Sequence, residues 1–115
     1  MAGSTGHATN MNIFVHFLGR RRSRRVVEFA QRMLHRALAR VGQPIREIRL
    51  RIRDENAARG GIDHRCSLEI RMEHGGTLHL HDLAADPESA VHRLAQRAGR
   101  VLRNAGARRR QELHR

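Results

Sequence analysis

The sequence lacks several features that would indicate other classes of protein. Its 115 residues include no lysine, tryptophan or tyrosine, one cysteine and two prolines. The lone Cys66 excludes an internal disulfide and is typical of a protein in a reducing cytosol. The longest apolar run, Ile13 to Leu18, is too short to cross a bilayer, and the small polar residues 1–10 lack the apolar stretch of a secretory signal. We therefore expect a soluble, cytoplasmic protein with a disordered tail over residues 1–10.

The shortage of aromatic residues limits how a nucleic acid could be bound. The chain has three phenylalanines and no tyrosine or tryptophan. Proteins that bind single strands usually stack bases on exposed aromatic rings. We therefore expect recognition to depend on phosphate, shape and arginine.

Charge is the most informative property of the chain. All 23 basic residues are arginines, against 11 acidic residues, which gives a net charge of +12. Codon drift in a GC-rich genome explains arginine in place of lysine, but it does not explain the net charge. Such an excess in a small domain indicates an acidic partner, most often a polynucleotide. The planar guanidinium binds phosphate through two hydrogen bonds and stays charged at physiological pH.

Apolar periodicity predicts a strand, a helix and a second strand in the first half of the chain. Residues 12–18 are mostly apolar and indicate a strand, but the pattern leaves open whether odd or even positions point inward. Ser23 is a typical N-cap for a helix through about Val41, which Gly42 is expected to end. Over 48–53, apolar residues alternate with arginines, as in a strand with one buried face.

Alternation resumes after a loop and predicts a β-hairpin. Because facing residues must share a face of the sheet, we expect Ile70 to pair with Leu80 across a three-residue loop, 74–76, that contains two glycines. This register also places Glu69 beside His81 on the exposed face.

A second helix is predicted after the hairpin. Asp86 and Pro87 are typical of its N-cap and first residue. The helix is expected to run to about Ala105 and to end at Gly106, so that residues 107–115 form a basic C-terminal tail. Its predicted core positions are Ala90, Val91, Leu94, Ala95, Ala98, Val101, Leu102 and Ala105.

The order of elements is β-α-β-β-β-α, which belongs to the α+β class. Strands with one apolar face need a cover, and two amphipathic helices can supply it. We expect one domain over residues 11–106, built as a two-layer sandwich with both helices on one face of a four-stranded sheet.

Arginines are concentrated on the polar side of both helices. In the last helix they recur within roughly a 120° sector nearly opposite the core stripe. A ridge of this kind on one helix could be only its solvated side, but two ridges, a cluster at 20–25 and a basic tail together favour polyanion binding. The predicted RNA-binding residues are Arg22, Arg24, Arg25, Arg32, Arg36, Arg93, Arg97, Arg100, Arg103, Arg108, Arg109 and Arg110.

Catalytic and metal sites are not indicated by the sequence. His79 and His81 have the spacing of metal ligands on a strand, but no further ligand is evident apart from His64 or Glu69. Cys66 is expected to be a small buried hydrophobe rather than a nucleophile. We expect no enzymatic activity, cofactor, bound metal or small-molecule substrate.

Residues 54–66 carry a resemblance to a known family. They read Asp-Glu-Asn-Ala-Ala-Arg-Gly-Gly-Ile-Asp-His-Arg-Cys, and together with the element order this run resembles the ribosome hibernation-promoting factors. These are also called ribosome-associated inhibitor A or sigma-factor modulation proteins. The likeness covers about residues 11 to 110. Small members often have Asp-x-Asn-Gly-x-Lys/Arg-Gly-Gly-x-Asp-Lys/Arg-Arg-Cys here, and Ala57 stands at the first glycine of that pattern.

The resemblance implies a fold like a double-stranded-RNA-binding domain, seated on the small ribosomal subunit. In that family, basic helix surfaces lie against 16S ribosomal RNA in the channel used by messenger and transfer RNA, which blocks initiation and protects idle ribosomes during starvation. The family's basic positions match Arg93, Arg97, Arg100 and Arg103, and its basic extension matches 108–110. The chain stops before the dimerisation domain of long members, so the resemblance implies a monomer.

Two other functions remain open from the sequence. One is a generic RNA- or DNA-binding module without a ribosomal role. The other is an interaction protein for an acidic partner such as a sigma factor.

Overall fold

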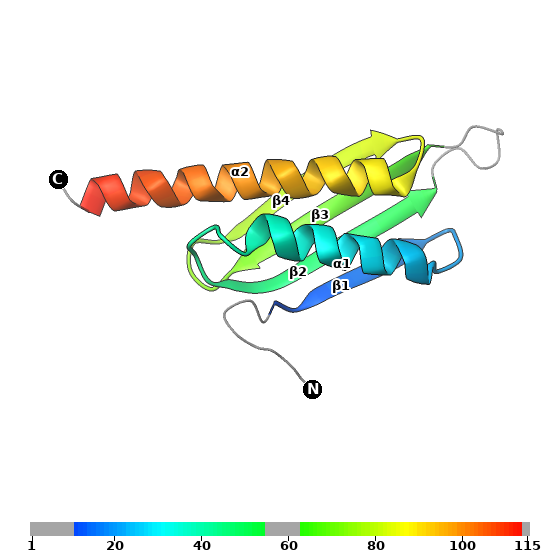
Figure 1. The fold of residues 1–115 in the computed structure, drawn as a ribbon, viewed down its shortest axis with the longest axis horizontal. Helices are drawn as coiled ribbons and strands as arrows, with labels where there is room; N and C mark the ends of the chain where they lie inside the picture. Colours follow the sequence, from blue (N-terminus) through cyan, green and yellow to red (C-terminus); the bar gives the residue numbers. More distant parts are fainter. Residues whose placement is uncertain (1–10, 55–62, 114–115) are drawn as a thin grey trace.

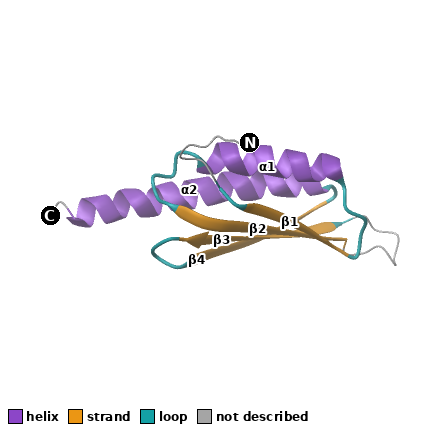
Figure 2. Ribbon diagram, turned by 90° about the horizontal axis from the view of Figure 1, so that it is seen from below, coloured by secondary structure: helices purple, strands orange, loops and turns teal. Residues whose placement is uncertain are grey.

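The protein is a two-layer α+β sandwich. The computed structural model describes residues 11–54 and 63–113, with side chains up to Arg108. The described elements, in chain order, are β1 (Ile13–Leu18), α1 (Arg24–Leu38), β2 (Ile45–Asp54), β3 (His64–Met72), β4 (Thr77–Ala84) and α2 (Pro87–Leu113). The sheet order is β1-β2-β3-β4, with β1 parallel to β2 and the other neighbours antiparallel. Both helices lie on one face of the sheet (Figures 1 and 2). The predicted fold class and element order are confirmed.

The core lies between this face of the sheet and the helices. The predicted inward residues of β2, Ile48, Leu50 and Ile52, are fully buried, because alternate side chains of a strand point to one face. In β1 the odd positions point inward, since Val15 is buried whereas Phe14 is 45 % exposed. This settles the orientation that the sequence pattern left open. Among the described residues, neither helix combines the length and apolar character needed to span a membrane.

Helix α1 begins where predicted and ends earlier. The backbone N–H of Val26 donates a hydrogen bond to Ser23 Oγ at 3.3 Å, which confirms Ser23 as the N-cap. The helix ends at Leu38, about three residues before the expected Val41. Val41 is nevertheless buried. Val41 lies in the turn after the helix and still packs into the core, at the position where the apolar period expects a buried residue. The period alone therefore overestimates the length of the helix.

The hairpin register differs from the prediction by two residues. Ile70 pairs with Leu78 rather than with Leu80, and Glu69 therefore faces His79 instead of the predicted histidine two positions later. A shift of two keeps every apolar side chain on the same face. Alternation therefore could not distinguish the two registers.

The turn of the hairpin decides the register. The Met72 N–H donates to the Gly76 carbonyl oxygen at 3.0 Å, so the loop is formed by residues 73–75 instead of 74–76. Both Gly75 (φ +97°) and Gly76 (φ +91°) have positive φ, a region that side-chain-bearing residues rarely adopt. The two consecutive glycines thus allow the three-residue loop to form one residue earlier than predicted, because either position can adopt positive φ.

Helix α2 begins as predicted but continues past its expected end. The Ser89 backbone N–H donates to Asp86 Oδ1 at 2.8 Å, and the Ser89 hydroxyl donates to Oδ2 at 3.0 Å. The helix extends through Gly106 to Leu113, so residues 107–113 are helical rather than a tail. A glycine inside a helix costs only about 1 kcal/mol relative to alanine, which its alanine- and arginine-rich neighbours can offset.

The end of α2 projects beyond the sheet (Figure 1). Val101 is 42 % exposed and Ala105 is also exposed, although the sequence period placed both in the core. Leu102 is buried, as predicted. Leu102 and Gly106, one helical turn apart, are both buried. The covered stripe is therefore narrower here than the apolar period predicts, and it leaves Val101 and Ala105 exposed.

Candidate nucleic-acid interface

The two helices pack closely, and a glycine in α2 allows this approach. A Cβ added at Gly99 would lie 2.9 Å from the carbonyl oxygen of Ala37 in α1, which is closer than real Cβ atoms approach. Only a residue without a side chain fits there. The contact leaves a groove of about 440 Å³ between the helices, which we call the interhelical groove. It is lined by Met33, Arg36, Ala37, His92, Ala95, Gln96, Gly99, Arg100 and Arg103.

Three arginines from two helices converge on this groove. Arg36 comes from α1, and Arg100 and Arg103 come from α2. All three are exposed, and within the part of the chain that the structure describes none of them has an ion pair or a hydrogen bond. Their positive charges are therefore uncompensated. Guanidinium groups arranged in this way can bind phosphate oxygens through paired hydrogen bonds.

The basic surface continues along α1. Arg32 and Arg36 line a second hollow, of about 630 Å³, together with Met11, Ile13 and His35 beside the β1 edge. Arg36 thus belongs to both hollows and connects them. Arg32, like Arg36, is exposed and has no recorded partner among the described residues.

The predicted arginines before and at the start of α1 differ in how they are held. The Arg22 guanidinium donates to the Val15 carbonyl oxygen at 3.1 Å, which fixes the side chain and leaves its charge uncompensated. Arg25 Nε lies 4.0 Å from a Glu88 carboxylate oxygen, with 90 % of the Arg25 side chain exposed. Such an exposed pair contributes little to stability. Arg24 is also exposed.

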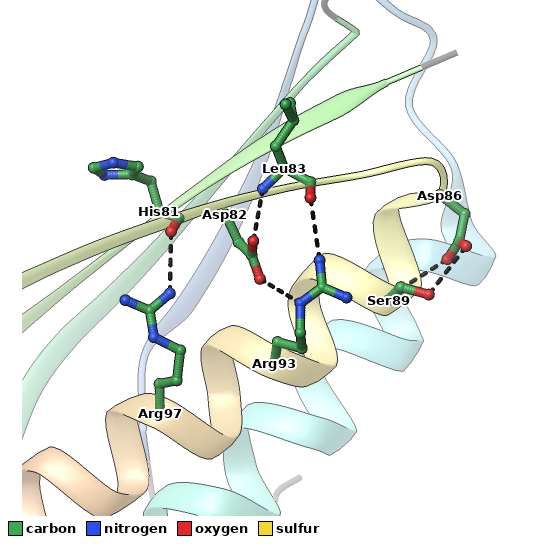
Figure 3. A network of polar contacts seen from close by, with 7 residues as sticks. All are labelled: His81, Asp82, Leu83, Asp86, Ser89, Arg93 and Arg97. Carbon is green, nitrogen blue, oxygen red and sulfur yellow. Dashed lines mark hydrogen bonds and ion pairs between the residues drawn. The ribbon is translucent and has the colours of Figure 1, made fainter.

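Arg93, one of the predicted RNA-binding residues, does not present a free charge. Its Nε donates to Asp82 Oδ2 at 2.6 Å, and a terminal nitrogen donates to the Leu83 carbonyl oxygen at 3.1 Å (Figure 3). The hydrogen bond from Arg93 holds the pKa of the Asp82 carboxyl below its usual value, and the same carboxylate raises the pKa of Arg93. Asp82 points toward the helices because it pairs with the inward-facing Cys66.

Arg97 is intermediate between these two situations. Its guanidinium donates to the His81 carbonyl oxygen at 3.1 Å (Figure 3). A carbonyl does not neutralise a cation, so Arg97 is positioned against β4 but keeps its charge. Its partly buried side chain is less available than those of the interhelical groove.

Three further predicted residues lie in the last turns of α2. Arg108 is exposed in this part of α2. Arg109 and Arg110 belong to the helix, but their side chains are outside what the structure describes. Residues 55–62 of the family-like motif also lie outside the described residues.

The sequence interpretation did not identify several residues of the groove. His92 and Gln96 line it and were not predicted as binding residues. The sequence signal that could have indicated the groove is Gly99, since a glycine within a run of strong helix formers indicates that another backbone approaches closely.

Cys66 is buried as predicted. Its side chain is fully enclosed, and burial raises the pKa of the thiol to about 12. A thiol in this state is a poor nucleophile at neutral pH. In the described ranges, 11–54 and 63–113, no three or more His, Cys, Asp or Glu side chains gather as a metal site would require.

Comparison with known proteins gives a likeness in fold. No protein-family model and no curated protein matches the sequence. Among solved structures, the Thermus thermophilus Protein Y N-terminal domain superposes with a TM-score of 0.68 at 14% identity, over 82% of this chain and 98% of that one. A ribosomal subunit interface protein from Coxiella burnetii superposes with a TM-score of 0.69 at 19% identity, over 84% and 99% of the two chains. These similarities establish that the chain has the fold of these proteins.

Proposed function

We propose that this protein is a ribosome-associated factor of the hibernation-promoting family that binds RNA through its helical face. The observation that carries the proposal is the convergence of Arg36, Arg100 and Arg103 on one groove with no described counter-charge. The family-like run at residues 54–66 and the shared fold with a ribosomal subunit interface protein support a ribosomal partner. No catalytic grouping accompanies the groove in the described residues, and we propose a non-enzymatic role.

The partner that we propose is 16S ribosomal RNA in the decoding channel of the small subunit. A rigid domain with a basic face would inhibit initiation by occupying space that messenger and transfer RNA need. The groove suits a folded RNA backbone, because its floor is made of small side chains and its rim of phosphate-binding groups. The resemblance further suggests that the factor acts under starvation, in the cytoplasm and as a monomer.

Co-sedimentation with purified small subunits tests this function. We expect the full chain to migrate with the small subunit at low salt and to dissociate as salt rises, with a steep dependence of log affinity on log salt concentration. Binding that is unchanged at high salt would contradict the proposal. Arg36→Ala, Arg100→Ala and Arg103→Ala should each lower the affinity and reduce the salt slope, roughly by 0.7–0.9 for each lost phosphate contact. Arg46→Ala is the matched control. It also removes one positive charge, but Arg46 is exposed and lies outside the groove.

A generic nucleic-acid-binding module is the second candidate. It is favoured by the three arginines that converge on the groove, because phosphate contacts alone carry no sequence information. Competition separates the two functions: equal affinity for small subunits, random duplex RNA and plasmid DNA would support the generic module. A protein partner such as a sigma factor would instead remain bound after nuclease treatment in a pull-down.

A further inference from the structure

The sheet face opposite the helices carries a second basic surface. No described element covers this face (Figure 2). β2 places Arg49, Arg51 and Arg53 on it at alternate positions, about 6.6 Å apart along the strand. Arg49 forms an ion pair with Glu47, whereas no described partner is recorded for Arg51 or Arg53. The strand therefore presents a line of cations with at least two free charges.

A hollow lies at the centre of this face. Ser67 on β3 pairs with Arg51 on one side and His81 on the other. Its small side chain between two larger ones leaves a depression of about 260 Å³, which we call the sheet hollow. The next cross-strand row places Glu69 and His79 at its border.

The groups around the sheet hollow match the chemistry of a nucleobase. The imidazole rings of His79 and His81 are planar and exposed, and bases stack on histidine rings and on guanidinium planes. Glu69 lies 3.9 Å from Arg71, too far for a hydrogen bond, so its carboxylate can still accept one from an N–H group. An exocyclic amino group of a base is such a donor.

The acidic group in the hollow argues against an acidic peptide as the ligand. A peptide carboxylate placed in the hollow would meet the Glu69 carboxylate and be repelled, whereas a neutral base would not. The hydroxyl of Ser67 and the oxygens of Glu69 also offer acceptors for a ribose 2′-hydroxyl, the group that distinguishes RNA from DNA.

We propose that the sheet hollow binds one base of a single-stranded RNA whose phosphates run along Arg51 and Arg53. This site is distinct from the interhelical groove and lies on the opposite side of the sheet, so both can be occupied at once. The proposal goes beyond the ribosomal function and does not depend on it.

Fluorescence anisotropy with the full chain and labelled ten-nucleotide RNAs tests the proposal. We expect the double variant His79→Ala/His81→Ala to bind oligocytidine about tenfold more weakly, in keeping with the contribution of a stacked base. Thr77→Ala is the matched control, because Thr77 is exposed on the same strand but does not line the hollow, and it should bind like the unmodified protein. Thermal unfolding followed by circular dichroism verifies that each variant is folded.

Base and sugar identity provide a second readout. Oligocytidine should bind more tightly than oligouridine, because cytosine has an amino group for Glu69 and uracil has none. Glu69→Gln should reduce the difference in affinity between oligocytidine and oligouridine, since an amide can donate a hydrogen bond to uracil as well as accept one from cytosine. The deoxy oligonucleotide of the same sequence should bind more weakly than the RNA.

Several outcomes would overturn the proposal. One such outcome is that the histidine double variant binds RNA as tightly as the unmodified protein. Another is that only Arg100→Ala/Arg103→Ala loses oligonucleotide binding. Either result would assign the binding to the helical face. Equal binding of deoxy and ribo oligonucleotides would overturn the assignment to RNA. If polyglutamate displaces the labelled RNA as effectively as unlabelled RNA does, and base identity has no effect, the partner of this face is an acidic protein. Because the histidine variants should still co-sediment with small subunits, this test and that of the ribosomal function fail independently.

Discussion

The two halves of α2 carry the same residue type at the same helical spacing and use it differently. In the first half, Arg93 and Arg97 reach the edge strand β4 and bind Asp82 and backbone carbonyls. In the second half, Arg100 and Arg103 border the interhelical groove with no described partner. The first arginines of this helix therefore bind the sheet, and the later ones are exposed to solvent.

The difference depends on what lies beside each turn of the helix. β4 is the edge strand beside the first half of α2, and it offers an acidic side chain and carbonyl oxygens that are within reach (Figure 3). The residues that line the interhelical groove include no carboxylate. An arginine in a helical ridge thus becomes structural or free according to its neighbours, and its place in the ridge alone does not decide which.

A large effect on stability is expected at Gly99, where the two halves of α2 meet α1. Gly99→Val should place a branched side chain against the backbone of Ala37 and destabilise the fold by about 3 kcal/mol, the upper range for overpacking. Ala105→Val, at an exposed position of the same helix, should change stability by less than about 1 kcal/mol. Urea unfolding measures both. Equal stability of the two variants would show that the close helix approach is not needed.

The next effect distinguishes free from engaged arginines in RNA binding. Arg100→Ala and Arg103→Ala should each weaken binding to small subunits about tenfold at moderate salt, because a hydrogen-bonded charge pair contributes about 1.5–3 kcal/mol. Arg93→Ala should weaken it less than about threefold, since its guanidinium is already bound to Asp82. Affinities from anisotropy or sedimentation decide the comparison. A larger loss for Arg93→Ala would reverse the roles assigned to the two halves.

A smaller effect concerns the pH dependence of stability in the first half. The Asp82 pKa is lowered in the folded protein, chiefly by the hydrogen bond from Arg93, from an ordinary value of 3.8. The stabilisation is therefore present above about pH 4 and is lost as the pH falls through the lowered folded-state pKa. Asp82→Asn should be less stable than the unmodified protein at pH 7, and the difference should shrink as the pH falls below the ordinary value of 3.8 and through the lowered pKa of Asp82. Thermal midpoints between pH 2.5 and 7 test this, and a constant difference would exclude the ion pair as its cause.

The smallest effect is expected at Val101, at the boundary between the halves. Val101→Ala should change the free energy of unfolding by less than about 0.5 kcal/mol, because the side chain is largely exposed. Leu102→Ala, one residue later and buried, should cost about 2–5 kcal/mol. Denaturant unfolding compares the two. A similar loss at both positions would indicate that a further surface covers Val101.

Much of the fold could be predicted from local patterns. Alternating residues in β2 and the capping groups Ser23 and Asp86 are local signals, and each was confirmed. The predictions that failed involve distances along the elements. Three predictions were wrong in this way: the end of α1, the hairpin register and the end of α2 at Gly106. None of these differences moves an apolar residue to the other face of its element, so the apolar period could not distinguish the alternatives.

The candidate site was predictable only in part. The sequence indicated which faces of the helices are basic, and it included Arg36, Arg100 and Arg103 among the expected binding residues. It did not indicate that Arg93 is tied to Asp82, because the two are eleven residues apart and belong to different elements. It also gave no account of the sheet hollow, which exists only because cross-strand pairing surrounds Ser67 with larger groups.

By itself, the sequence determined the class of the fold, the buried faces and the excess of positive charge, because these follow from side-chain periodicity and composition. Only the tertiary structure decided which arginines are free and which are bound to their own fold. The reason is physical: the availability of a charge depends on the carboxylates and carbonyls within a few ångströms of it, and those neighbours come from segments that are distant in the chain.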